Sequence, residues 1–380
     1  MPRRSTALLL AAVLVLGVAA CSAAPARRFD PAFYVAPSPM PAGRPGDVLR
    51  MEQVTKLDGG GQALRVLYRS TSLAGKPIAV SGIIAEPGGR PPAGGWPVIS
   101  LAHGTVGLAD ACTPSHLPVR DAAEFTKRGY VVAASDYEGL GTAGRHPYLV
   151  GESEARGTID IVRAARALGA TVGAGRRYVV IGYSQGGQAA LFANQIASTW
   201  APELQLVGTV AGAPVVELAQ LLEHVGSDPV YDWLKASMVA GFATVDPSAD
   251  PAAVLGASAA HDLRVIDHQC VKEVAAAIDG KAPIGDLRTV APFAQLLATN
   301  TPGQVRGASP VYLLGGSRDP LITPALLDAG MARLCASGDV VQRKRYKGVN
   351  HDTIITASLL DAVVWAHQRF AGAPPRDDCR

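Results

Sequence analysis

A serine lies at the centre of a short glycine-flanked pattern, Gly182-Tyr183-Ser184-Gln185-Gly186. An apolar run at residues 178–182 predicts a strand before it, and a helical pattern begins near Gly187. In this context the pattern is typical of a nucleophile elbow, a tight turn that holds its serine in a strained backbone conformation. The glycines are needed because side chains two positions from the serine would collide within the turn. We therefore predict that Ser184 is a nucleophile.

A serine nucleophile of this kind needs an acid and a histidine, which follow it along the chain in that order. Asp319 comes shortly after a predicted strand at residues 310–314, and His351 follows the last predicted strand, residues 340–346. His351 would accept the proton of Ser184, and Asp319 would hold the imidazole in the required tautomer. We predict these three residues as a catalytic triad.

Both assignments have competitors in the sequence. Asp319 could instead cap the helix that follows it, and Asp328 or Asp339 could then be the acid. Neither competitor directly follows a strand. His367 is the alternative histidine, but it lies well inside the last predicted helix, far from the end of a strand. The positions of the residues therefore favour Asp319 and His351.

A turn at the end of another apolar strand, residues 97–102, supplies the remaining element of such a site. It reads His103-Gly104-Thr105. We predict an oxyanion hole made by the backbone N–H groups of Gln185 and Thr105, with Val106 as the alternative to Thr105. Each donor would stabilise the tetrahedral intermediate by roughly 3 kcal/mol. We expect His103 to brace the turn rather than to react.

These residues are held by short apolar strands that alternate with helical patterns, which predicts an α/β fold with a mostly parallel sheet flanked by helices. The predicted strands are residues 63–71, 77–85, 97–102, 130–135, 178–182, 206–211, 310–314 and 340–346. Four helical patterns follow one another after residue 215 without a convincing strand. We predict a core of residues 48–214 and 309–380, interrupted by a helical insertion at 215–308.

Residues 139–144 match the G-x-G-x-x-G pattern of dinucleotide-binding sites. In such sites the glycines begin a helix at once, whereas Pro147 disfavours a helix here. We interpret this segment as a loop near the rim of the active site, and we expect no cofactor.

The first residues have the pattern of an export signal. Arg3 and Arg4 precede an apolar stretch at residues 7–20, which as a helix would span roughly 21 Å, less than the ~30 Å core of a bilayer. The stretch ends in two alanines and Cys21, which resembles the lipidation site of bacterial lipoproteins. We predict a signal peptide at 1–20, a lipid anchor on Cys21 and a tether at 21–47. Ordinary signal cleavage is the alternative, and the protein would be a cell-surface lipoprotein or secreted.

Composition excludes several other classes of protein. With 48% hydrophobic and 18% charged residues, the 380-residue chain can bury a large core. Its net charge of +3, which falls to +1 without Arg3 and Arg4, provides no basic surface for nucleic acid. The five cysteines form no C-x-x-C pair and no cluster with histidine, so we expect no metal site.

Taken together, the motifs resemble the secretory lipase family of α/β-hydrolases, which contains fungal lipase A-type enzymes and actinobacterial relatives. The likeness runs from about residue 48 to 370 and rests on the runs at 102–105, 112–115, 136–141 and 182–187 and on the turns at Asp319 and His351. It implies an α/β-hydrolase fold whose helical cap supplies an acyl-binding tunnel. It also implies hydrolysis of a small-molecule or lipid ester, often an acylglycerol. The family's triad falls on Ser184, Asp319 and His351. Fungal members carry an acid in the oxyanion loop, where this chain has Thr105-Val106.

Apart from Cys21, the four remaining cysteines allow three disulfide pairings. A bridge from Cys112 to Cys270 would pin the insertion over the site, and one from Cys335 to Cys379 would clamp the C-terminus. The other pairings would tie the tail to the insertion or to the oxyanion loop, which the short segment 371–378 makes awkward. Similar bridges in the resembling family point to the same pairing, which we predict.

We therefore expect a serine esterase or lipase. An acyltransferase or a peptidase could use the same triad, because the fold does not determine the acyl acceptor. A non-catalytic surface binding protein of hydrolase fold is the third hypothesis, and the presence of all three triad residues argues against it.

Overall fold

The computed structural model describes residues 30–57, 61–116 and 122–380. The predicted signal peptide and the predicted lipidation site at Cys21 lie outside the described residues. Within the described part of the chain, no helix has the length and apolar character needed to cross a membrane.

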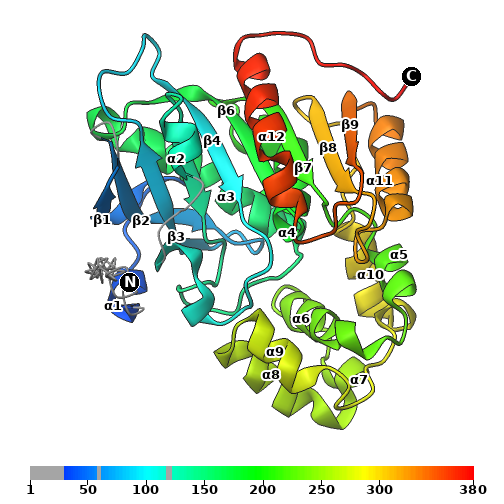
Figure 1. Ribbon diagram of the computed structural model, residues 1–380. Helices are drawn as coiled ribbons and strands as arrows, with labels where there is room; N and C mark the ends of the chain where they lie inside the picture. Colours follow the sequence, from blue (N-terminus) through cyan, green and yellow to red (C-terminus); the bar gives the residue numbers. More distant parts are fainter. Residues whose placement is uncertain (1–29, 58–60, 117–121) are drawn as a thin grey trace, which may run out of the picture.

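A nine-stranded sheet forms the centre of the described residues, in the order β1-β2-β3-β5-β4-β6-β7-β8-β9 (Figure 1). The strands are β1 (Val48–Lys56), β2 (Gln62–Thr71), β3 (Pro77–Glu86), β4 (Trp96–Ala102), β5 (Val131–Ser135), β6 (Ala174–Tyr183), β7 (Gln205–Gly212), β8 (Val311–Gly316) and β9 (Val341–Tyr346). From β5 to β9 all neighbouring strands are parallel, whereas β1, β2 and β3 join the edge by antiparallel pairing. The predicted mostly parallel sheet is confirmed.

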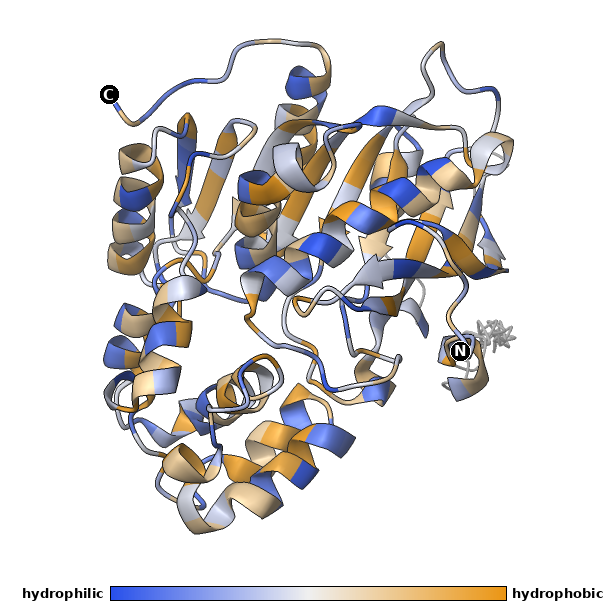
Figure 2. Cartoon of the chain, turned by 180° about the vertical axis from the view of Figure 1, so that it is seen from behind, coloured by the Kyte–Doolittle hydropathy of each residue, from blue (hydrophilic) through white to orange (hydrophobic). Residues whose placement is uncertain are grey.

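Helices cover both faces of this sheet, and the alternation of side chains along each strand explains why. In β6, Tyr178 and Val180 pack into the cluster under α3 and α4, while Val179 and Ile181 pack on the opposite face under α2 and α12. The helices are α1 (Pro31–Tyr34), α2 (Ala122–Thr126), α3 (Gly151–Ala167), α4 (Gln185–Trp200), α5 (Leu218–Val225), α6 (Asp232–Phe242), α7 (Ala252–Leu255), α8 (Ala259–His268), α9 (Val271–Ile278), α10 (Ala291–Thr299), α11 (Pro324–Ala336) and α12 (Ile354–Phe370). Figure 2 shows the resulting hydrophobic strands at the centre of the molecule, as expected for strands buried on both faces.

The predicted helical insertion corresponds to α5–α10, which lie between β7 and β8 in the chain. Figure 1 shows α6, α7, α8 and α9 grouped beyond the sheet, on the side where β4 ends. Apolar residues of this segment pack against one another rather than facing solvent; Leu221, Leu234 and Met238 are all at most 2% exposed and belong to one core cluster.

Some elements were not predicted from the sequence. Strand β1 is an edge strand whose side chains are all partly or fully exposed, so it lacks the alternation that marks a half-buried strand. Helix α8 buries only Asp262 and Ile266, too few apolar positions to show a helical period. Helices α1, α2 and α7 have five residues or fewer.

Part of the predicted tether, residues 21–47, lies within the described residues, and it packs against the sheet. Phe33 and Tyr34 are buried against Leu67 and Ala79, and the Tyr34 hydroxyl lies 2.9 Å from the hydroxyl of Ser115. Two neighbouring aromatic side chains gain more by covering the sheet than by staying in water. Pro/Ala-rich composition alone did not reveal this anchoring.

Both predicted disulfides are present in the structure. Cys112 is bonded to Cys270, which ties the segment that follows β4 to the start of α9. The same region is held by a hydrogen bond from Val271 N–H to Val106 O (3.1 Å). Cys335 of α11 is bonded to Cys379, which holds the C-terminal tail against the domain.

Removing the second bridge is expected to destabilise the fold. The bond joins residues that are 44 positions apart, and in the chain-entropy estimate a loop of this size contributes about 4 kcal/mol. The double variant Cys335→Ser/Cys379→Ser should therefore unfold at a lower urea concentration than the wild type, both measured in buffer without added oxidant or reductant, so that the wild-type bridges stay intact. An unchanged free energy of unfolding would show that the Cys335–Cys379 bridge contributes nothing to stability.

Candidate active site

The loop between β6 and α4 has the geometry of a nucleophile elbow. Ser184 has φ 55° and ψ −118°, a conformation that L-residues rarely adopt. Side chains at the flanking glycines have no room, because a Cβ on Gly182 would collide with the carbonyl of Gly186, and one on Gly186 would collide with the carbonyl of Ala102. A Cβ on Gly187 would lie 2.8 Å from Pro214, so this glycine lets α4 approach the segment after β7 closely.

Three side chains from distant parts of the chain form a line of hydrogen bonds. His351 Nε2 lies 3.0 Å from Ser184 Oγ, and His351 Nδ1 lies 2.8 Å from Asp319 Oδ2. The carboxylate can only accept, so Nδ1 carries the proton and Nε2 is free to accept the proton of the serine hydroxyl. Asp319 and Ser184 are 3% and 5% exposed, so this line is largely shielded from water. It has the arrangement that a serine-histidine-aspartate triad requires.

Asp319 does not cap the following helix, because the N-cap of α11 is Thr323; the second oxygen of Asp319 instead fixes the turn before that helix. Oδ1 accepts hydrogen bonds from the N–H groups of Leu321 (3.0 Å) and Ile322 (2.8 Å). These bonds fix the carboxylate plane, so that Oδ2 points to His351.

The alternative residues lie elsewhere and have structural partners. Asp328 forms ion pairs with Arg343 and Arg345 on the surface. The carboxylate of Asp339 accepts from the N–H of Gly307. His367 Nδ1 lies 2.9 Å from the hydroxyl of Tyr130.

Of the predicted oxyanion residues, Gln185 directly follows the nucleophile, and Thr105 follows β4, which is paired with β6. Gln185 is the first residue of α4, and the first N–H groups of a helix have no partner within the helix, so they are available to an anion. Thr105 follows β4, and its hydroxyl lies 2.8 Å from the hydroxyl of Tyr148. His103 braces the turn as expected, since its ring nitrogens lie 2.7 Å from Gly104 O and 3.2 Å from Asp136 O.

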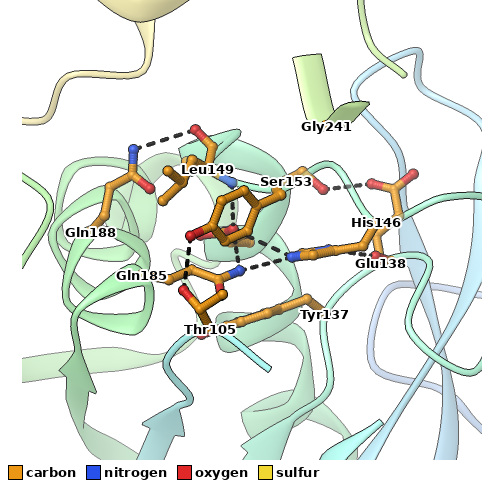
Figure 3. Close-up of polar contacts among 12 residues, drawn as sticks. Thr105, Tyr137, Glu138, His146, Leu149, Ser153, Gln185, Gln188 and Gly241 are labelled. Atoms are coloured by element: carbon orange, nitrogen blue, oxygen red, sulfur yellow. Dashed lines mark hydrogen bonds and ion pairs between the residues drawn. The ribbon is translucent and has the colours of Figure 1, made fainter. Parts of the chain in front are cut away.

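Sequence reasoning missed a set of buried polar side chains behind these residues. Figure 3 shows the side chain of Gln185 next to His146. The same Gln185 amide donates to Glu154, and the Tyr148 hydroxyl lies 2.8 Å from that of Thr105. The sequence offered one signal for these residues. His146 and Tyr148 come shortly after the glycine-rich stretch at 139–144, which we interpreted as a loop near the rim of the active site. Tyr183 was also missed; its hydroxyl donates to the carbonyl of His351 (2.6 Å) and so supports the loop that carries the histidine.

The insertion contacts this same region. Arg145 pairs with Asp267 of α8 through two hydrogen bonds of 2.6 and 2.8 Å. Gly241 of α6 lies against the backbone of Tyr148, where an added Cβ would be 2.6 Å from both the nitrogen and the oxygen. Within the described ranges, no cluster of three or more His, Cys, Asp or Glu side chains could hold a metal ion.

The chain is similar to known lipases. The family model described as "Secretory lipase" matches residues 122–378, more than half of the chain. A Mycobacterium tuberculosis protein named "Probable inactive lipase MT1628" is 24% identical, covering 92% of this chain and 83% of its own. Lipase A of Moesziomyces aphidis is 23% identical, with coverage of 92% and 82%.

Solved structures share the fold. Lipase A of Candida antarctica superposes with a TM-score of 0.76 at 21% identity, covering 92% of this chain and 87% of its own. The rice cell wall degrading esterase LipA of Xanthomonas oryzae superposes with a TM-score of 0.70 at 21% identity, with coverage of 87% and 98%. The predicted α/β-hydrolase fold is thus confirmed, and the chain belongs to the secretory lipase family of ester-hydrolysing enzymes.

Proposed function

We propose that this protein hydrolyses carboxylic esters through an acyl-enzyme formed on Ser184. The hydrogen-bonded line from Ser184 through His351 to Asp319 is the observation that carries the proposal. Residues 215–308 act as the cap over this site, and the reaction needs no cofactor.

In the first half of the reaction, Ser184 Oγ attacks the ester carbonyl carbon while His351 Nε2 takes the hydroxyl proton. Asp319 stabilises the imidazolium that forms. The N–H groups of Gln185 and Thr105 stabilise the negative oxygen of the tetrahedral intermediate. Collapse of this intermediate breaks the bond to the alcohol, which leaves with the proton from His351. Water then repeats these steps on the acyl-enzyme and releases the acid.

The proposal is tested by mixing the purified protein with p-nitrophenyl butyrate and p-nitrophenyl laurate. We expect a burst of nitrophenol followed by steady turnover, and after reaction with a fluorophosphonate we expect the peptide that contains Ser184 to carry the added mass. Product analysis with added alcohol separates hydrolysis from acyl transfer. No turnover of either ester and no labelling of Ser184 would refute the proposal. That outcome would instead match the word "inactive" in the name of the mycobacterial relative.

We propose a lipid ester as the substrate. A cavity of about 500 Å³ borders Gly104 of the oxyanion loop and Tyr183, the residue before the nucleophile. Its walls are mainly apolar and include Leu101, Ile181 and Leu359. Such a lining suits a hydrocarbon chain better than a polar group. Relatives named as lipases support the same substrate class, among them a secreted triacylglycerol lipase of Malassezia globosa that is 27% identical over 212 residues.

We also propose that the mature protein is exported and anchored to the membrane through lipidated Cys21. We expect wild-type protein to sediment with membranes, and Cys21→Ala to appear in the soluble fraction, because one lipid-modified residue supplies the attachment. Cell fractionation with intact-mass measurement of the mature N-terminus checks this. An unmodified N-terminus downstream of Cys21 would show ordinary signal cleavage and a freely secreted enzyme.

A further inference from the structure

One loop touches both residues that we propose as oxyanion donors. It spans residues 145–150, between the glycine-rich stretch and α3. Its Tyr148 hydroxyl lies 2.8 Å from Thr105 Oγ1, and its His146 Nε2 lies 2.8 Å from the side-chain nitrogen of Gln185. Thr105 follows the end of β4, and Gln185 follows the end of β6, so this loop joins the two sides of the proposed oxyanion hole (Figure 3).

The Gln185 amide is held in one orientation. His146 Nδ1 lies 2.9 Å from the carbonyl of Glu138, so Nδ1 carries the proton and Nε2 accepts. One N–H of the Gln185 amide therefore donates to His146, and the other donates to Glu154 Oε1 (2.8 Å). Both hydrogens of the NH₂ group are used, which fixes the far end of this side chain.

Glu154 lies in the first turn of α3 and is fully buried. Its Oε1 accepts from Gln185 and from the N–H of Leu149 (3.0 Å). Its Oε2 is buried without a hydrogen-bond partner in the structure. A charged carboxylate with one oxygen unpaired is costly in such a place, whereas a neutral carboxyl group is tolerated far better.

The surroundings of Glu154 agree with a neutral group. Burial raises the pKa of Glu154 to about 8 and lowers the pKa of His146 to about 3. The other titratable groups that face Glu154 are Tyr137 and Tyr148, and burial raises the pKa of both hydroxyls. Among the described residues, no Lys or Arg forms an ion pair with Glu154. The basic side chain that lies near its carboxyl group is that of His146, whose Nε2 is 3.6 Å from Glu154 Oε1.

We propose that His146, Tyr148 and neutral Glu154, which we name the oxyanion clamp, are positioning residues that hold Gln185 and Thr105 in the geometry the oxyanion hole needs. This inference rests on the proposed function. Gln185 directly follows the strained Ser184, and the clamp holds the far end of its side chain, which restrains the residue whose N–H would bind the oxyanion. Donor positions matter because displacement of about 1 Å can cost about 100-fold in rate.

The protonation state of Glu154 is part of the proposal. Its carboxyl group contacts the side chain of Gln185, the residue whose peptide N–H would bind the oxyanion. Below about pH 8 the group is neutral and leaves the developing negative charge undisturbed. Above that pH it ionises, and a second negative charge in a water-poor site opposes formation of the intermediate.

The test compares kcat, KM and Tm of four variants on p-nitrophenyl butyrate across pH 6 to 10. We expect Glu154→Leu to lower kcat about 100-fold with little change in KM, because Gln185 loses an acceptor. We expect Glu154→Gln, which keeps a neutral oxygen acceptor, to retain kcat near pH 7 and to lack the decline that the wild type shows above about pH 8. Tyr148→Phe should lower kcat about 10-fold. Tyr178→Phe is the matched control, since its buried hydroxyl has no hydrogen-bond partner.

An active wild type whose alkaline decline is unchanged in Glu154→Gln would overturn the clamp. So would a Glu154→Leu or Tyr148→Phe enzyme that unfolds at lower temperature but keeps the wild-type kcat. If Glu154→Leu does not fold, Tyr148→Phe and the pH profile of Glu154→Gln still decide the question. A wild type without turnover would instead refute the proposed function, so the two failures are distinguishable.

Discussion

Replacing Ser184 with alanine is expected to lower kcat for ester hydrolysis by about 10⁶-fold. Without the hydroxyl no acyl-enzyme forms, and water must attack the ester directly. The fold should be unaffected, since the Ser184 hydroxyl bonds to no side chain but His351 among the described residues, and alanine fits the same space. Steady-state kinetics with p-nitrophenyl butyrate, together with thermal unfolding, measure both parts.

Ser337→Ala is a suitable control for this variant. Its hydroxyl donates to the carbonyl of Leu334 at the end of α11, away from the elbow, and its loss should leave kcat unchanged. If Ser184→Ala kept more than about one hundredth of the wild-type rate, Ser184 would not be the nucleophile. A loss of activity accompanied by unfolding would show a structural role instead.

Local patterns were sufficient to predict the parts of the site that a single turn or strand end determines. The elbow could be predicted because its glycines answer a steric need within five residues, and the structure shows those collisions. Asp319 and His351 could be predicted because each follows a parallel strand, and the carboxyl ends of parallel strands β6, β8 and β9 meet at one edge of the sheet. Their catalytic roles stay predictions until the variants are measured.

The clamp could not be predicted in the same way. His146 and Gln185 are 39 residues apart, and nothing near either one indicates that they meet. His146 lies in a loop and Glu154 in the first turn of a helix, and residues of these types at such places are more often exposed to solvent. Only the packing of α3 beside α4 buries Glu154 and leaves one oxygen without a partner. Likewise, the burial of Phe33 and Tyr34 depends on the surface of β2 and β3, which composition does not describe.

The second large effect is expected for Asp319→Asn, which should lower kcat by about 10⁴-fold with little loss of stability. The backbone N–H groups of Leu321 and Ile322 will keep the amide oxygen at the Oδ1 position, so the NH₂ group must face His351. Nδ1 then has to accept, the proton moves to Nε2, and the imidazole no longer takes the proton of Ser184.

Asp328→Asn decides between this assignment and its competitor. Asp328 lies on the surface, where it pairs with Arg343 and Arg345, so the substitution should leave kcat within about twofold of the wild type. Kinetics of the two variants at one pH, with Tm measured for each, make the comparison direct. A larger loss for Asp328→Asn than for Asp319→Asn would mean that Asp328, and not Asp319, is the acid of the triad. Equal small losses would mean that His351 needs no carboxylate to hold its tautomer. The geometry favours neither outcome, because Asp319 is the carboxylate that lies 2.8 Å from Nδ1 of the histidine.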